Sequence, residues 1–304
     1  MKTRKLGKYG PEVPVICLGA WPLGGGMGEL TEKQITDTVH ASVDCGVTFI
    51  DTAEGYRTSE AMLGKALEGR RGGVFLATKL SGDHSLEHMN RAIENSLRSL
   101  RTAYVDLYQI HSPQPTYPIQ QTMEGLLKLK EQGKIRYVGV SNFSAEQHAQ
   151  ALRHGHIDSS QPQYSMLVRT AEEEVLPLCL ENGIGVMVHS PLAKGLLTGK
   201  HDPDRRFPAD DERSWMAAFQ GERFASALNV VEDLQEWAEG RGHSVVQLAI
   251  AWTLANTAVT SSIVGAKSPQ QVLHNAEAAE WVLTPEDLDE LDELQGEFRI
   301  LSLH

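Results

Sequence analysis

A regular alternation of short apolar runs with longer amphipathic stretches is the feature that most constrains the fold of this chain. The apolar runs have the length and near-continuous hydrophobicity of buried parallel strands. The stretches between them carry apolar residues at every third or fourth position, as in Leu86–Leu100, and this spacing is typical of helices that pack on a core. The alternation occurs eight times in 304 residues, which predicts an α/β fold of the (β/α)8 barrel, or TIM barrel, type. The predicted strands are Val15–Ala20, Gly46–Ile50, Val74–Leu80, Val105–Ile110, Ile135–Val140, a short run ending near Gln163–Tyr164, Gly185–Ser190 and Ser261–Gly265.

Turn residues and helix-start signals predict the elements around these strands. Gly7 and the Tyr9–Pro11 turn predict a short N-terminal hairpin, and the start signal at Thr284 predicts an extra C-terminal helix. Thr31 and Thr170 each stand three residues before Gln or Glu, so a capping box is expected to begin a helix at both. The other predicted helices are Ser59–Gly69, Ser85–Leu100, Thr122–Gln132, Ser144–His154, Ser226–Glu239, Ser244–Asn256 and Ser268–Glu280.

Domain organisation and compartment follow from what the sequence lacks. No Gly/Ser-rich linker or change of composition interrupts the alternation, so residues 1–304 are expected to form a single domain. The irregular segment from about Pro191 to Glu222 is longer than most loops and predicts a functional loop. The formal net charge of −12 argues against a nucleic-acid partner. No apolar run reaches the length of a membrane span and no signal-peptide core follows the basic N-terminus, so a cytoplasmic protein without a membrane partner is expected.

Four polar residues follow consecutive predicted strands. Asp51 and Tyr56 follow the second strand, and Lys79 lies at the end of the third. His111 follows the fourth. In a parallel barrel the carboxyl ends of all strands open onto one mouth, where ligands bind. All four side chains are therefore expected to meet in one cavity.

A series of motifs along nearly the whole chain resembles those of the aldo-keto reductases, in particular the bacterial-type NADP(H)-dependent oxidoreductases. The resemblance implies a (β/α)8 barrel that transfers a hydride between a nicotinamide cofactor and a carbonyl. The motifs that carry it are Asp51–Tyr56 with Ser59–Glu60, Thr78–Lys79, Leu107–Pro113, Gly139–Phe143, Gln161–Ser165, Ser190–Gly199 and Gly265–Lys267.

Hydride reduction of a carbonyl sets the chemistry that these residues must supply. Negative charge builds on the carbonyl oxygen, so a proton donor must stand beside it. A tyrosine has a pKa of about 10, a nearby ammonium lowers that pKa, and a carboxylate keeps the ammonium charged and in place. The resemblance implies these roles for Tyr56, Lys79 and Asp51. It also implies that His111 hydrogen-bonds and orients the carbonyl.

The hydride has to come from a cofactor, because no amino-acid side chain donates one. The resemblance implies a nicotinamide cofactor extended across the strand ends, with Ser141, Asn142 and Gln163 at its carboxamide, which suits their donors and acceptors. Lys267, at the start of the eighth helix, favours a 2′-phosphate and therefore NADP(H) over NAD(H). The other positions that the resemblance assigns to the cofactor are Gly19, Trp21, Asp51, His189, Ser190, Pro191, Leu192, Lys194, Gly195, Leu196, Gly265, Gln271 and Asn275.

Some positions depart from the family pattern. His189 stands where the family usually has an aromatic residue that stacks on the nicotinamide, and an imidazole stacks more weakly. Arg57 replaces a glycine that often follows the catalytic tyrosine. It either reaches toward an anionic substrate group or is a solvated loop arginine. The chain ends at His304, soon after the last helix, so little tail is expected over the pocket, which suggests an open site and broad substrate acceptance.

Two further patterns are weaker candidates for sites. Gly195–Lys200 resembles a phosphate loop but is one residue short of the Walker pattern, and His201 stands where Ser or Thr should hold magnesium. His84–His88 matches a zinc-protease pattern, but no third ligand accompanies it, so no metal is expected.

The sequence thus predicts an NADP(H)-dependent oxidoreductase whose small-molecule partner is an aldehyde or ketone, or an alcohol in the reverse direction. Two alternatives remain at this stage. One is a nicotinamide-binding regulatory or sensor barrel with little catalysis, and the other is a barrel lyase or isomerase that works without nicotinamide. The sequence does not indicate the oligomeric state or the physiological substrate.

Overall fold

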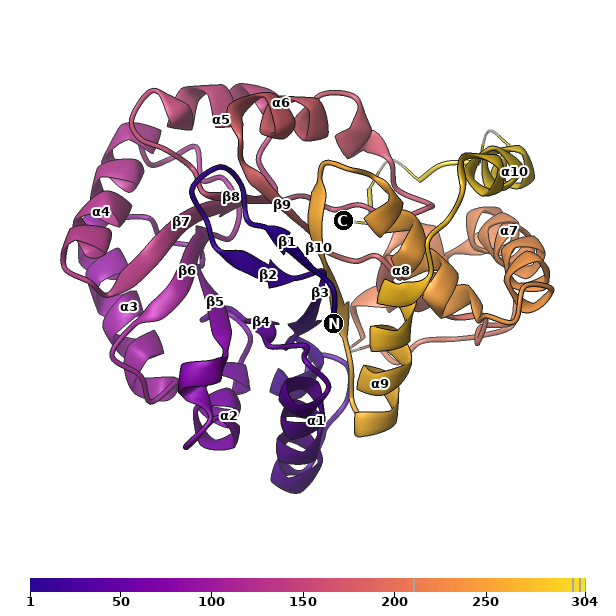
Figure 1. Ribbon diagram of the computed structural model, residues 1–304, viewed down its shortest axis with the longest axis horizontal. Coiled ribbons are helices and arrows are strands. Elements are labelled where there is room, and N and C mark those ends of the chain that lie inside the picture. The colour runs from indigo at the N-terminus through magenta and orange to yellow at the C-terminus, as the bar shows by residue number, and fades with distance from the viewer. Residues whose placement is uncertain (210, 297, 301, 304) are drawn as a thin grey trace.

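A closed barrel of eight parallel strands forms the centre of the molecule (Figure 1). The structure is a computed structural model that describes residues 1–209, 211–296, 298–300 and 302–303. The strands follow the order β10-β3-β4-β5-β6-β7-β8-β9 around the ring, so the predicted (β/α)8 fold is confirmed. The barrel strands are β3 (Ile16–Gly19), β4 (Phe49–Asp51), β5 (Phe75–Leu80), β6 (Val105–Ile110), β7 (Ile135–Ser141), β8 (Ser159–Gln161), β9 (Gly185–Val188) and β10 (Val259–Gly265).

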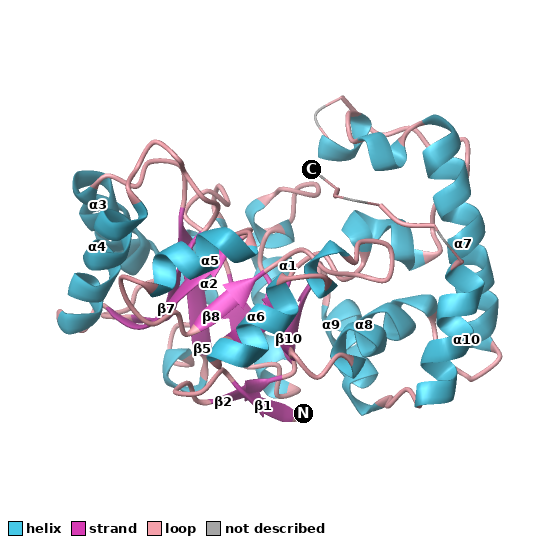
Figure 2. Ribbon diagram, turned by 90° about the horizontal axis from the view of Figure 1, so that it is seen from above, coloured by secondary structure: helices cyan, strands magenta, loops and turns pink. Residues whose placement is uncertain are grey.

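Helices cover the outside of the barrel, and most begin where a capping residue predicts. Thr31, Ser144 and Ser244 each close a capping box with a residue three positions later. Thr284 does the same at the extra C-terminal helix α10, which packs on α7 on one side of the barrel (Figure 2). The helices are α1 (Glu32–Asp44), α2 (Ser59–Ala66), α3 (Leu86–Ser99), α4 (Ile119–Glu131), α5 (Ala145–Leu152), α6 (Val175–Asn182), α7 (Gly221–Glu239), α8 (Val245–Ala255), α9 (Pro269–Glu277) and α10 (Pro285–Gln295).

The capping box expected at Thr170 is wrong. Thr170 begins a 3-10 turn and makes no capping bond, and α6 begins only at Val175. The carboxylate of Glu172 in this turn accepts hydrogen bonds from the Tyr164 hydroxyl at 2.6 Å and from Arg169 Nε at 3.0 Å. These contacts hold the segment as a turn, so the helix starts later.

Other element boundaries differ by a few residues. α4 begins at Ile119 and α7 at Gly221, each earlier than expected, and the helix expected to reach Glu280 ends in a 3-10 turn after α9. β8 ends at Gln161, two residues early, because Pro162 has no N–H to continue the ladder. Only an isolated bridge from Gln163 to His189 extends the pairing.

The predicted N-terminal hairpin closes one end of the barrel. β1 (Thr3–Lys5) and β2 (Glu12–Pro14) pair antiparallel and cross the middle of the ring in Figure 1. Leu6 and Val13 are fully buried among side chains of the barrel interior such as Phe49. The hairpin therefore fills the amino-terminal end of the barrel and leaves the carboxyl end open. Among the described residues, no helix is long and apolar enough to cross a membrane.

Candidate functional site

Strand register brings the candidate catalytic residues to the carboxyl end of the barrel. Asp51, the last residue of β4, pairs with Gly19 of β3 and Ala77 of β5. Lys79 lies two residues further along β5 and pairs with Gln109 of β6. Asp51 and Lys79, which the sequence predicts at the same end of the barrel, are therefore neighbours in space.

Lys79 is the centre of a buried polar cluster. It is 0% exposed, and its Nζ donates hydrogen bonds to Asp51 Oδ2 at 2.5 Å and to the Thr52 carbonyl at 2.9 Å. The same ammonium lies 3.4 Å from the Tyr56 hydroxyl. A buried ammonium is tolerated only where a counter-charge and hydrogen bonds offset its desolvation, as they do here.

The pKa of Tyr56 is raised, not lowered. Burial raises it most, the charge of Lys79 lowers it, and burial outweighs Lys79. Lys79 lowers the pKa of Tyr56 as expected, but the expectation that this pKa is lowered overall is wrong. Burial alone would lower the pKa of Lys79, yet Asp51 and Tyr56 together raise it, so this side chain remains an ammonium.

Two glutamines that sequence analysis did not assign to the catalytic cluster hold the other oxygen of Asp51. Gln109 Nε2 donates to Asp51 Oδ1 at 3.0 Å, and Gln161 Nε2 donates to the same oxygen at 3.1 Å. Both glutamines are almost fully buried. Gln109 interrupts the mostly apolar strand β6, whereas Gln161 ends the polar strand β8 and begins the Gln161–Ser165 motif.

His111 stands beside Tyr56 at the mouth. Their rings meet edge to face with centroids 5.4 Å apart, and the Trp21 ring also meets the Tyr56 ring edge to face, with centroids 5.0 Å apart. Nδ1 of His111 lies 2.8 Å from Ser81 Oγ, which fixes the ring from behind. The phenol and the imidazole therefore face the same space.

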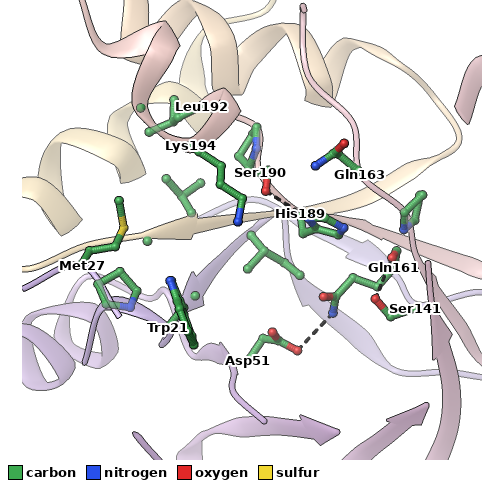
Figure 3. A pocket seen from close by; sticks show the side chains of 18 of the residues that line it. Trp21, Met27, Asp51, Ser141, Gln161, Gln163, His189, Ser190, Leu192 and Lys194 are labelled. Atoms are coloured by element: carbon green, nitrogen blue, oxygen red, sulfur yellow. Dashed lines mark hydrogen bonds between the residues drawn. The ribbon is translucent and has the colours of Figure 1, made fainter. Parts of the chain in front are cut away.

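That space is a cavity of about 1130 Å³ at the carboxyl ends of the strands (Figure 3). Figure 3 shows Asp51 and Gln161 joined by a hydrogen bond, with Trp21 and His189 on different sides of the space. Of the predicted site residues, Lys79 and Leu196 do not line the cavity, since both are fully buried beneath its surface. The predicted residues that do line it are Gly19, Trp21, Asp51, Tyr56, His111, Ser141, Asn142, Gln163, His189, Ser190, Pro191, Leu192, Lys194, Gly195, Gly265, Lys267, Gln271 and Asn275.

His189 and Asn142, which both line the cavity, hydrogen-bond to each other. His189 Nε2 lies 2.9 Å from Asn142 Oδ1, and Asn142 Nδ2 donates to the His111 carbonyl at 3.0 Å. Asn142 has a φ of 60°, a left-handed conformation that asparagine tolerates better than most residues. The unusual histidine therefore orients the amide of Asn142 through a hydrogen bond.

The C-terminal tail reaches the cavity, contrary to the expectation that little tail would cover it. Ile300 and Leu303 are buried, and Ile300 N donates to the Leu167 carbonyl at 2.8 Å. Leu303 N donates to Gln163 Oε1 at 3.0 Å, and Ser302 lines the cavity. The tail thus holds one of the predicted carboxamide-binding side chains.

Lysines are also among the residues that line the cavity. Lys267 stands just before α9, and its Nζ donates to the Met27 carbonyl. Lys194, on the loop after β9, forms an ion pair with Glu212 at 2.8 Å. Arg57 is not among the lining residues, because its guanidinium donates to the Gly25 carbonyl on the rim at 3.2 Å.

The residues present fit an extended nicotinamide cofactor. Gln163 Nε2 and Trp21 Nε1 are buried donors on cavity-lining side chains, and neither has a hydrogen-bond partner among the described residues. Buried donors without partners are rare in native proteins and indicate a missing acceptor. The carboxamide oxygen and the phosphates of a bound nicotinamide cofactor would supply such acceptors.

Comparison with known proteins agrees with this geometry. The model of the "Aldo/keto reductase family" matches residues 15–295. This chain belongs to the aldo-keto reductases. Among curated relatives it is 38% identical to aldo-keto reductase YhdN of Bacillus subtilis, over 96% of this chain and 93% of the relative. It is 34% identical to an NADH-specific methylglyoxal reductase of Escherichia coli, over 91% of this chain and 93% of the relative.

Solved structures of aldo-keto reductases superpose over nearly the whole chain. A glycerol dehydrogenase from Gluconobacter oxydans matches with a TM-score of 0.89 and 33% identity, covering 99% of this chain and 96% of that one. An aldo/keto reductase from Klebsiella pneumoniae, in complex with NADP and acetate, matches with a TM-score of 0.78 and 32% identity, covering 97% of this chain and 95% of that one. This aldo-keto reductase therefore has relatives whose names specify different substrates and cofactors.

Proposed function

We propose that this aldo-keto reductase is an NADP(H)-dependent carbonyl reductase that acts on aldehydes or ketones as a single-domain enzyme of residues 1–304. The observation that carries the proposal is the buried Asp51–Lys79 pair, which points its ammonium at the Tyr56 hydroxyl on the floor of the cavity. NADPH, when bound, supplies the hydride. Tyr56 donates its proton to the carbonyl oxygen as negative charge develops there.

The other lining residues bind and orient the reactants. His111 donates a hydrogen bond to the same carbonyl oxygen. Ser141 and Asn142 hold the carboxamide, together with the amides of Gln161 and Gln163, which line the same part of the cavity. Lys267 at the start of α9 favours a 2′-phosphate, which supports NADP(H) over NAD(H).

The raised pKa of Tyr56 favours reduction at neutral pH. The folded pKa lies above the usual value of about 10, so the phenol keeps its proton throughout the neutral range. Alcohol oxidation needs the phenolate as a base, and its rate is therefore expected to rise with pH through the alkaline range. Reduction is expected to change little until the pH approaches the pKa of Tyr56.

The first test is NADPH consumption with a panel of aldehydes and ketones, for the wild type and for Tyr56→Phe. General acid catalysis contributes about 10²- to 10⁴-fold, so Tyr56→Phe should lower kcat by that factor. Binding of NADPH, followed by quenching of tryptophan fluorescence, should be preserved.

Tyr9→Phe is the matched control, because Tyr9 is 62% exposed and lies near the hairpin, away from the cavity. A Tyr56→Phe enzyme that keeps most of its turnover would exclude the proposed acid. NADPH binding without turnover on any carbonyl would instead indicate a sensor barrel.

A further inference from the structure

A glycine-rich loop between β3 and α1 lies against Tyr56, the proposed proton donor. We call residues Gly24–Gly28 the glycine loop, because four of the five are glycine and the fifth is Met27. A Cβ at Gly24 would lie 2.2 Å from the Tyr56 carbonyl oxygen, so the loop packs directly on the backbone of that residue. Met27 lines the cavity, and Figure 3 shows it on the same side of the space as Trp21.

Few contacts of its own hold the glycine loop in one conformation. Glycines have no side chain to pack, and they lose more conformational freedom on ordering than other residues do. The N–H groups of Gly24 and Gly25 donate to the Trp21 and Pro22 carbonyls at 3.2 and 3.3 Å, which are long for such bonds. Segments with so few firm contacts open locally at a small cost in free energy.

Two cations hold the glycine loop through its carbonyl oxygens. Arg57 donates to the Gly25 carbonyl at 3.2 Å, but this contact is exposed to solvent. Lys267, just before α9, donates through Nζ to the Met27 carbonyl, and this contact is partly buried. Hydrogen bonds that are shielded from water are stronger, so Lys267 is the main tie between the loop and the opposite wall of the barrel mouth.

The Lys267 ammonium is poorly compensated at this position. Burial and the charge of Arg213 lower its pKa, and the charge of Asp211 only opposes them. Its acceptor, the Met27 carbonyl, is neutral. A phosphate oxygen is the better acceptor for an ammonium, because charge-assisted hydrogen bonds are about twice as strong as neutral ones. A 2′-phosphate at the start of α9 would therefore compete with Met27 for Lys267.

We propose that Lys267 is a latch that holds the glycine loop in place at the cavity of the free protein, and that a 2′-phosphate releases the loop by taking this ammonium from the Met27 carbonyl. The loop then responds to which nicotinamide cofactor is bound, since NAD(H) has no phosphate at this position. The inference rests on the proposed preference for NADP(H).

Hydrogen exchange of the full chain without ligand tests the latch. The amides of Gly24 and Gly25 report opening of the loop, because their hydrogen bonds lie within it. Lys267→Met should raise their exchange rate about tenfold, the effect expected from loss of a hydrogen bond to a charged group. Lys267→Arg, which keeps a cationic donor, should restore most of the protection. Lys128→Met, at an exposed position of α4, is the matched control and should leave the exchange rate unchanged.

Unchanged exchange of the loop in Lys267→Met would overturn the latch. A rise that extends to the barrel strands would also overturn it, because it would show general destabilisation of the fold.

The release is tested with adenosine 2′,5′-bisphosphate and adenosine 5′-phosphate, which differ only in the 2′-phosphate. At saturation, followed by calorimetry, the bisphosphate should raise the exchange rate of the loop in the wild type, and the monophosphate should not. Neither should change it in Lys267→Met. Failure of the bisphosphate to bind, an equal rise with both nucleotides, or a loop that stays protected would overturn the release. No carbonyl substrate is present, so absence of reductase turnover would contradict the proposed function without bearing on the latch.

Discussion

Asp51 is satisfied on both of its carboxylate oxygens. Oδ2 accepts from Lys79, and Oδ1 accepts from Gln109 and Gln161. Asp51, Lys79, Gln109 and Gln161 therefore form one buried network of hydrogen bonds. In such a network, removal of a single charge leaves its partner buried without compensation, which is worse than removal of both.

Asp51→Asn is expected to lower the free energy of unfolding by about 3–5 kcal/mol, because it leaves the Lys79 ammonium buried without a counter-charge. Lys79→Met should have an effect of similar size. The double variant should lose less than the sum of the two, as measured by urea denaturation without cofactor. Asp37→Asn, in the exposed Lys33–Asp37 pair, is the control and should show no measurable change. Strictly additive losses would show that the pair is not coupled.

At this scale, the sequence predicts best the residues that end a strand. Asp51 and Lys79 could be placed at one mouth because parallel strands share a carboxyl end. The contacts of Ser81 with His111 and of Gln109 with Asp51 could not be predicted, because they depend on strand register and on which loops lie next to each other. The direction in which the pKa of Tyr56 shifts could not be predicted either, because burial of the side chain in the folded state decides it.

Among elements, those with their own periodicity or caps could be predicted, and those fixed by tertiary contacts could not. The capping boxes at Thr31 and Thr284 depend only on local residues. The turn at Thr170 depends on a contact with Tyr164, which lies three residues after the end of β8. The tail has no periodic pattern, so its contact with Gln163 is visible only in the structure.

Leu303→Asp is expected to release the tail, because Leu303 is 2% exposed and an aspartate there would have to be desolvated. Gln163 would then lose the backbone donor that fixes its amide. The KM for NADPH or for the carbonyl should rise several-fold while the free energy of unfolding changes little. Steady-state kinetics and urea denaturation measure the two quantities. Leu294→Asp, on the exposed side of α10, is the matched control. Unchanged KM values would show that the tail does not support the site.

At the scale of the whole molecule, the two ends of the barrel have different contents. The hairpin of β1 and β2 fills the amino-terminal end, and the cavity occupies the carboxyl end. The interior between them is apolar at the hairpin end, where Leu6 and Phe49 are fully buried, and polar at the Asp51 end. Barrel enzymes commonly show this division, with catalytic residues confined to the carboxyl face.

Leu6→Ala tests this division, because Leu6 is 0% exposed and lies at the hairpin end. Loss of its side chain leaves a cavity and should lower the free energy of unfolding by about 2–5 kcal/mol. Since the mouth lies at the other end, kcat/KM per folded molecule should match the wild type. Urea denaturation and steady-state reduction on the same preparation measure both. A variant that unfolds normally but loses activity would show that the hairpin end is coupled to the chemistry, and that the two ends of this barrel do not act independently.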